Sequence, residues 1–414
     1  MRSPAAAALL AITVLTLPGD DSTEPRWIVL NRIARQALDA KDYPKLRDTL
    51  AELRPLLPGN PRILYKLAAA DAHLGQQERA LAELRDLTSA GLIYDFAADD
   101  DFASLRGSAG FASVLRQVEQ NRKPVARAVP VSVLPERDLL PEDIAYDAKT
   151  RRYLIGSVTE CKVVTADGKL FAKSDWPVMA LRMDPRRRIL WAATGWVANC
   201  RHCKAADRDK SALLAFDADS GALLKRVDSP VKGLLGDMTI SIEGDLYVSE
   251  GLHGAVLRLQ ATSATLERLD MPGEFPSPQT SALSSDERTL YVPDYVRGIA
   301  AMNLNTRAVR WLQTTHDIVA GGIDGFYRYG DAFLAVQNGV KPPRVLLFSS
   351  GFTKQEILEA NTPGLGEPTH GTLVGDVFYF IANTGWDAYG DDGKKKPDSA
   401  PVESQIRKIV LTER

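Results

Sequence analysis

The sequence predicts a multidomain α and β protein, with a short N-terminal helical array followed by an all-β six-bladed propeller. Two observations carry this prediction. Six segments share one pattern, in which a polar turn precedes a short apolar strand that stops on a small or acidic residue. They lie at 151–156, 188–193, 244–249, 288–293, 330–335 and 375–380. Residues 25–121 differ, because they are rich in Ala, Leu, Arg and Glu and their apolar residues recur at helical spacing.

The spacing of the six segments identifies the β architecture. Equivalent positions are separated by 37, 56, 44, 43 and 45 residues, counted between Tyr153, Leu190, Leu246, Leu290, Phe333 and Phe378. A period of about 40–50 residues with several strands per unit is the signature of a β-propeller. The long second step predicts an insertion over 197–211, and a polar insertion is also expected over 386–404. The propeller is therefore assigned to residues 136–414.

The N-terminus predicts export. A basic residue, Arg2, precedes an apolar stretch over 5–17 and a polar exit, which is the pattern of a secretory signal peptide over residues 1–23. The stretch is too short for a transmembrane helix. We expect a secreted or periplasmic protein that does not associate with a membrane after signal removal. A net charge of −2 also argues against nucleic-acid binding.

Residues 24–121 resemble a degenerate tetratricopeptide array of about two units. The sequence Leu-Ala-Glu-Leu-Arg at 50–54 recurs at 81–85, and Gly75 is expected to turn the chain between two helices. Two units are fewer than usually stand alone, so the array should pack against the propeller or cap itself. Its exposed face is a candidate docking surface for a protein partner.

Residues 122–135 are expected to link the two parts and to close the propeller. The segment 129–134 alternates as a β-strand does, and the last blade should end near 406–411. Pairing of these two strands would remove the free edges of an open ring.

The chain has three cysteines, Cys161, Cys200 and Cys203. In an oxidising compartment the simplest expectation is one disulfide and one free thiol. The disulfide could be local or could join two loops. The Cys-x-x-Cys spacing also leaves zinc or redox chemistry open.

One position per blade should face the propeller channel, at the start of the innermost strand. About 9–11 residues before the six reference positions, the blades carry Glu142, Met179, Gly236-Asp237, Gln279, Asp324 and Glu367. Carboxylates gathered in a narrow channel favour a hard cation with oxygen ligands, calcium above all. The alternative is that these groups face a water-filled tunnel and are solvated.

Several of these motifs resemble the senescence marker protein/gluconolactonase family, which is related to strictosidine synthase-like proteins and paraoxonases. The resemblance covers about residues 130–414 and rests on short motifs, namely 140–147 (Leu-Pro-Glu-Asp-Ile-Ala-Tyr-Asp), 236–239 (Gly-Asp-Met-Thr), 277–280 (Ser-Pro-Gln-Thr), 291–295 (Tyr-Val-Pro-Asp-Tyr) and 323–326 (Ile-Asp-Gly-Phe). It implies a six-bladed propeller with a divalent metal, usually calcium, that hydrolyses lactones or related esters.

The resemblance also implies roles for individual residues. Glu142 matches the first-blade metal carboxylate, and Asp324 matches the late-blade metal aspartate. Asp237 matches an acid beside the substrate. Gln279 stands where the family has a ligand asparagine, and Gly236 replaces a neighbouring asparagine.

The resulting candidate site has three parts. The metal ligands are Glu142, Gln279, Asp324 and Glu367. Asp237 would orient or deprotonate water, and His370 would be an alternative base or else a hydrogen-bonded core histidine. Gln279, Trp386 and Phe326 would contact substrate, although aromatic residues between blades more often pack.

Three functional hypotheses follow. The first is an exported, calcium-dependent lactonase or esterase that acts on a small lactone or ester. The second is a non-catalytic propeller that binds a ligand or a protein, with the helical array as docking surface. The third is a channel metal with a purely structural role. The fold cannot decide among them, because propellers host many functions.

Overall fold

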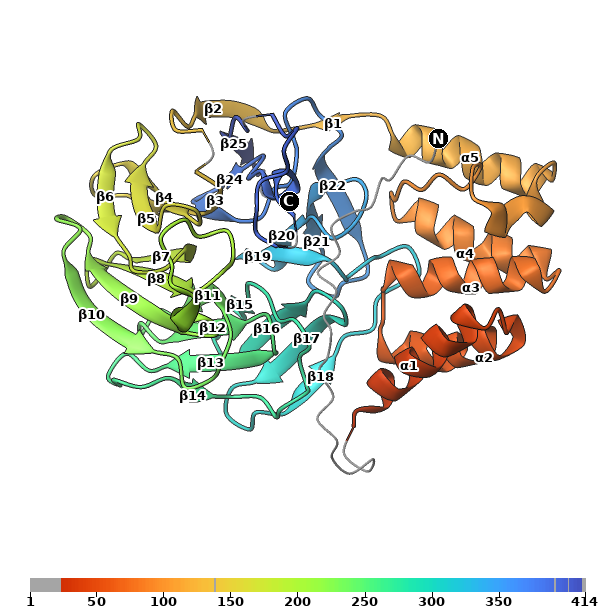
Figure 1. The fold of residues 1–414 in the computed structure, drawn as a ribbon, viewed down its shortest axis with the longest axis horizontal. Coiled ribbons are helices and arrows are strands. Elements are labelled where there is room, and N and C mark those ends of the chain that lie inside the picture. Colours follow the sequence, from red (N-terminus) through yellow and green to blue (C-terminus); the bar gives the residue numbers. More distant parts are fainter. Residues whose placement is uncertain (1–23, 138, 391, 401, 412–414) are drawn as a thin grey trace. The chain divides into compact units, whose positions relative to one another are not determined.

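The computed structural model describes residues 24–411, apart from 138, 391 and 401, and has the predicted fold class (Figure 1). Residues 26–121 form helices, and six antiparallel sheets follow, each built on four strands. The predicted signal peptide over 1–23 lies outside the described residues. Within them, no helix is long and apolar enough to cross a membrane.

The chain divides into two compact units. The first unit comprises residues 128–269 and 364–411, and holds blades one, two, three and six. The second unit comprises residues 24–127 and 270–363, and holds the helices with blades four and five.

The first unit has four sheets. Blade one contains β3 (Pro141–Asp147), β4 (Arg152–Ser157), β5 (Lys162–Thr165) and β6 (Leu170–Lys173). Blade two contains β7 (Val178–Asp184), β8 (Ile189–Gly195), β9 (Ser211–Asp217) and β10 (Leu223–Asp228). Blade three contains β11 (Leu235–Ile240), β12 (Leu246–Glu250), β13 (Ala255–Leu259) and β14 (Glu267–Arg268). Blade six contains β23 (Gly371–Val374), β24 (Val377–Ile381), β25 (Gln405–Val410) and β2 (Val129–Val133).

Blade six takes its outer strand from the beginning of the propeller sequence. β2 pairs antiparallel with β25, and Val129 faces Lys408 while Val133 faces Gln405. This is the pairing that the alternating pattern of 129–134 predicts. It covers the outer edge of β25, which would otherwise expose a row of unpaired backbone groups.

The second unit has two sheets and the helices. Blade four contains β15 (Ala282–Leu283), β16 (Thr289–Asp294), β17 (Gly298–Asn303) and β18 (Val309–Trp311). Blade five contains β19 (Ile323–Tyr329), β20 (Ala332–Gln337), β21 (Arg344–Phe348) and β22 (Gln355–Ala360), and β1 (Val125–Ala126) adds a fifth strand. In both units, the six repeating segments of the sequence are the second strands of the blades.

A polar residue at the end of the second strand ties down the loop that enters the same blade. In the first unit, Ser157 Oγ donates to the Leu139 carbonyl at 2.6 Å and Glu250 accepts from the Leu234 N–H at 3.0 Å. In the second unit, Asp294 accepts from the Ser277 N–H at 2.7 Å. These bonds satisfy buried backbone groups and fix where each innermost strand begins.

The helices are α1 (Arg26–Asp39), α2 (Tyr43–Leu53), α3 (Pro61–His73), α4 (Gln77–Ser89) and α5 (Ala109–Asn121), with short 3-10 turns η1 (Arg54–Leu56) and η2 (Asp100–Leu105). Side chains cap several of them, as Asn60 does by accepting from the Arg62 N–H at 3.0 Å. Gly75 has a φ of 70° and turns the chain between α3 and α4, as expected. The repeated Leu-Ala-Glu-Leu-Arg segments overlap α2 and α4.

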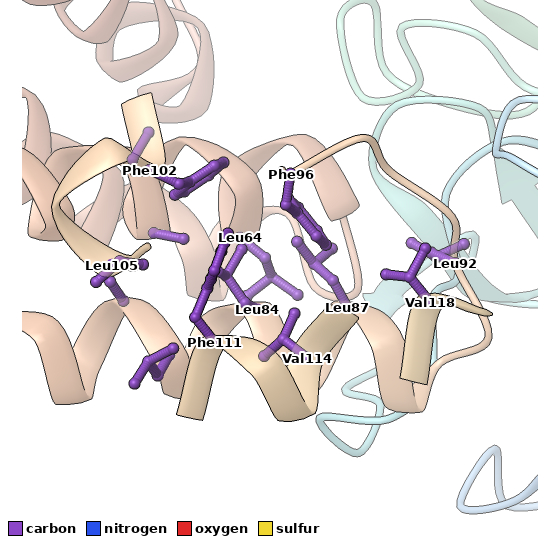
Figure 2. Close-up of a cluster of buried hydrophobic side chains, with 14 of the residues drawn as sticks. Leu64, Leu84, Leu87, Leu92, Phe96, Phe102, Leu105, Phe111, Val114 and Val118 are labelled. Carbon is purple, nitrogen blue, oxygen red and sulfur yellow. The ribbon is translucent and has the colours of Figure 1, made fainter. Parts of the chain in front are cut away.

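The array packs on blades four and five within the second unit, as expected for so few helices. One apolar core joins helical residues such as Leu64, Leu84 and Phe102 with Val319 and Val340 of the propeller; Figure 2 shows its helical part. Arg344, fully buried, donates to the Ala90 carbonyl at 2.6 Å. Both contacts belong to a continuous interior, so the helices and these two blades should unfold together.

Candidate acid–imidazole site

Three predicted site residues of the first unit meet in its interior. Glu142 lies on β3, Asp237 lies on β11, and His370 immediately precedes β23. Their exposed fractions are 6%, 4% and 1%. His370 Nε2 lies 2.5 Å from Asp237 Oδ1, and its Nδ1 lies 3.1 Å from the Glu142 carbonyl oxygen and 3.9 Å from Glu142 Oε1.

The hydrogen bonds fix how many protons the imidazole and its partner hold. A carbonyl oxygen can only accept, so His370 Nδ1 carries a proton. The contact between Nε2 and Asp237 Oδ1 needs one more proton between the two atoms. Either His370 is an imidazolium beside a carboxylate, or neutral His370 accepts from protonated Asp237. In both cases the pair has no net charge and shares one proton in a buried site.

Trp386 is the fourth member of this cluster. Its indole Nε1 donates to Glu142 Oε2 at 2.5 Å. Trp386 begins the 3-10 turn η4 (Trp386–Ala388), and Gly385 before it has a φ of 93°, a conformation that glycine adopts without strain. Thr369 Oγ1 also donates to the Glu142 carbonyl, at 2.7 Å. Glu142 is therefore held through both its backbone and its side chain.

Glu367, a predicted metal ligand, is close to Thr369 and His370 in the sequence but takes no part in the hydrogen bonds described above. It is half-buried, and its carbonyl accepts from Thr384 Oγ1 at 2.8 Å. Burial, and then the nearby Asp387 carboxylate, raise the pKa of Glu367 above its usual value. Glu367 therefore resists ionisation unless a cation compensates it.

Asp324, the other predicted metal aspartate, belongs to the second unit. It lies on β19, is 9% exposed, and its Oδ2 accepts from Asn338 Nδ2 at 2.6 Å. Asn338 Oδ1 in turn accepts from the Tyr295 hydroxyl at 3.0 Å. These two consecutive hydrogen bonds orient the Asp324 carboxylate, and they were not predicted from the sequence.

Two of the predicted positions do not lie on innermost strands. Gln279 precedes β15, and its side-chain amide donates to Ser277 Oγ at 3.1 Å. Glu367 precedes β23. Both positions still bond to the next segment of their blade, because the Gln279 N–H donates to the Pro293 carbonyl at 2.8 Å and the Glu367 carbonyl accepts from the Thr384 N–H at 3.2 Å.

The contact of Phe326 with substrate stays a prediction, and the structure gives this side chain a packing role. Phe326 is fully buried in a core of blades four and five, where its ring stacks on that of Phe333 at 5.1 Å between centroids. The alternation of β19 turns this side chain into the packing layer rather than toward a ligand.

Sequence reasoning missed three contacts around the acidic residues, namely those of Trp386 with Glu142, of Asn338 with Asp324 and of Tyr295 with Asn338. Asn338 directly follows β20, at the same edge as Gln337, which donates to the Val319 carbonyl at 2.9 Å. Polar residues at the ends of second strands are the signal that could have identified it. Trp386 lies in an insertion and has no comparable signal.

The donor set of the first unit fits a hard cation in part. Carboxylate oxygens such as those of Glu142 are the ligands that calcium prefers. Both ring nitrogens of His370 contact protein acceptors, so the imidazole would orient its neighbours rather than coordinate. The predicted four-ligand set draws on both units and stays a prediction.

Comparisons with known proteins add little to this description. No family profile matches the chain, and no curated protein matches it. The crystal structure of selenomethionine-substituted virginiamycin B lyase from Staphylococcus aureus has a TM-score of 0.43 and 16% identity, covering 61% of this chain and 80% of that one. A nidogen/laminin complex has a TM-score of 0.36 and 12% identity, covering 42% and 68%. Similarities this low carry no inference about activity.

Proposed function

We propose that this six-bladed propeller is a divalent-cation-dependent hydrolase of small lactones or esters, of the gluconolactonase-like kind. The observation that supports this most is the buried Asp237–His370 contact of 2.5 Å, with the Glu142 carboxylate on the other side of the imidazole. Buried acid–imidazole pairs are costly to build and cluster at sites that move protons. Calcium is the proposed cation. The proposed export would place the protein in a compartment where calcium is available.

Asp237 is the proposed general base. His370 Nε2 lies 2.5 Å from Asp237 Oδ1 and holds this carboxyl group in place. Asp237 accepts a proton from water while the oxygen of that water bonds to the ester carbonyl carbon. The same proton then passes to the departing alkoxide, so ester and water become acid and alcohol. A cation bound at Glu142 would polarise the carbonyl and stabilise the oxyanion.

The test is hydrolysis of a panel of lactones and aryl esters by purified protein, with calcium and with chelator, alongside elemental analysis. We expect bound calcium, and a loss of roughly 10²–10⁴-fold in kcat on Asp237→Asn. Asp331→Asn is the matched control, because Asp331 is exposed in the turn between β19 and β20 and lies outside the proposed site. An absence of turnover with every metal, or full activity in Asp237→Asn, would contradict the proposal.

A second candidate function is partner binding by the tetratricopeptide-like helices. It is favoured by a groove of about 470 Å³ in the second unit. Apolar residues line it together with charged residues of both signs, and these are Tyr94, Phe96, Leu115, Val118, Arg116, Arg122, Asp95 and Glu119. Arg122 pairs with Glu119 at 3.1 Å, so the apolar residues would carry the recognition of an amphipathic peptide. Binding of amphipathic peptides that is lost on Leu115→Glu, with no hydrolysis of any ester, would favour this function.

A further inference from the structure

The three cysteines form one cluster in the first unit. Cys200 and Cys203 are joined by a disulfide, in the insertion between β8 and β9. Cys161 is a free thiol, 4% exposed, in the turn between β4 and β5. Its Sγ lies 3.1 Å from Cys200 Sγ and 4.0 Å from Cys203 Sγ. This agrees with the simplest expectation of one disulfide and one thiol, and adds that they touch.

The contact is built by the surrounding segments. The Arg201 N–H donates to the Thr159 carbonyl at 3.1 Å, which lays the insertion along the turn that contains Cys161. Glu160 accepts from Arg201 Nη1 at 2.5 Å and lies 3.4 Å from His202 Nε2. Residues on both sides of each cysteine are thus joined, so the sulfur atoms are held together in the folded protein.

We propose that this cluster is a site of internal thiol–disulfide exchange. The Cys161 thiolate attacks Cys200 Sγ, a Cys161–Cys200 bond forms, the Cys200–Cys203 bond breaks, and the electron pair leaves on Cys203. One disulfide and one thiol are present before and after, so no oxidant or reductant is needed. Cys200 is the target because its sulfur is the nearer of the two. In-line attack requires the three sulfur atoms to be collinear, which would place Cys203 Sγ about 5 Å from Cys161 Sγ. These two atoms are 4.0 Å apart in the structure, so a movement of the insertion accompanies the step.

Burial makes the exchange slow at neutral pH. Burial, and then the nearby carboxylates of Glu160 and Asp175, raise the pKa of the Cys161 thiol to about 12. Only the thiolate attacks. At pH values below this pKa, the exchange rate should therefore increase about tenfold with each unit by which the pH is raised. Folded protein can therefore be studied at mildly alkaline pH, where exchange is faster.

The exchange would change an adjacent cleft. A cleft of about 800 Å³ is lined on one side by Ser174–Trp176 and on another by His202 and Lys204. The Ser174 N–H donates to the Cys161 carbonyl at 2.8 Å, while His202 lies within the Cys200–Cys203 loop. A Cys161–Cys200 bond would join these two sides covalently. It would also move the thiol from a buried residue to half-buried Cys203.

The test uses full-length wild-type protein without reductant, incubated with iodoacetamide near pH 7, 8 and 9. Acid quenching, peptic digestion and mass spectrometry then locate the label and the disulfide. We expect labelled Cys203 with a Cys161–Cys200 bridge, at a rate that rises about tenfold per pH unit. In Cys161→Ser, no residue should be labelled and the Cys200–Cys203 bridge should persist.

Two outcomes would overturn the proposal. One is label on Cys161 alone, with the Cys200–Cys203 bridge intact at every pH. The other is no label on any cysteine near pH 9. A folded Cys203→Ser protein provides an independent measurement, because oxidised glutathione should convert it to a Cys161–Cys200 disulfide, and two persistent thiols would contradict the geometry.

Discussion

The buried Asp237–His370 pair predicts unequal effects of replacing its two members. In Asp237→Asn, neutral His370 can keep its Nδ1–H bond to the Glu142 carbonyl while its Nε2 accepts from the new amide. Both ring nitrogens then retain a partner, and the expected loss is about 1 kcal/mol of unfolding free energy. In His370→Ala, a buried Asp237 carboxylate loses its cationic partner, and the expected loss is about 3–5 kcal/mol. The difference follows from the two contacts of 2.5 and 3.1 Å that the ring makes.

Urea denaturation at neutral pH, followed by tryptophan fluorescence and circular dichroism, measures these losses. His202→Ala is the matched control, because its side chain is 65% exposed and its loss should stay within about 0.5 kcal/mol. Equal losses in Asp237→Asn and His370→Ala would refute the shared-proton arrangement. A large loss in His202→Ala would show that the assay reports something other than the buried pair.

Three further predictions concern packing, titration and backbone conformation. Phe326→Ala should cost about 3–5 kcal/mol in denaturation, because the ring is fully buried, and a loss under about 1 kcal/mol would contradict the packing role. Burial raises the pKa of Asp294 to about 6, so the folded state binds a proton more tightly than the unfolded state does. Its contribution to stability is complete below about pH 4 and falls by roughly 3 kcal/mol as pH rises to about 6. The difference in unfolding free energy between wild type and Asp294→Asn should follow that slope, and a pH-independent difference would refute it. Gly75→Ala should lower the unfolding free energy by about 1–2 kcal/mol through its φ of 70° alone, since no atom lies within 4 Å of the added carbon. Gly75→Asn should lower it by less, because asparagine adopts this conformation more readily. Equal thermal midpoints for both variants and wild type would count against this reasoning.

Patterns that are local in the chain gave reliable predictions. The second strands of all six blades fall on the repeating segments, because a strand buried in a blade needs an apolar run bounded by turn residues. Gly75 could be placed for the same reason, since only a short stretch decides whether a helix pair can turn. The pairing of β2 with β25 was also accessible, because an alternating strand before the first blade has few other partners.

The direction of individual side chains was less accessible. Phe326 follows an aspartate in a motif that resembles a site, but strand alternation and the neighbouring Phe333 decide that it packs in the core. Gln279 and Glu367 lie just before the innermost strands of their blades, and the local sequence does not specify where regular pairing starts. A shift of one residue reverses the face that a side chain occupies.

The sequence by itself determined the helical array, the six-fold repeat and the acidic residues near the innermost strands. Periodicity, turn residues and strand length act over a few residues, so each leaves a readable pattern. Only the tertiary structure decided that His370 lies between Glu142 and Asp237, and that Trp386 contacts Glu142 across 244 positions. Contacts of that range depend on how whole blades and insertions pack, and no local pattern encodes the resulting distances.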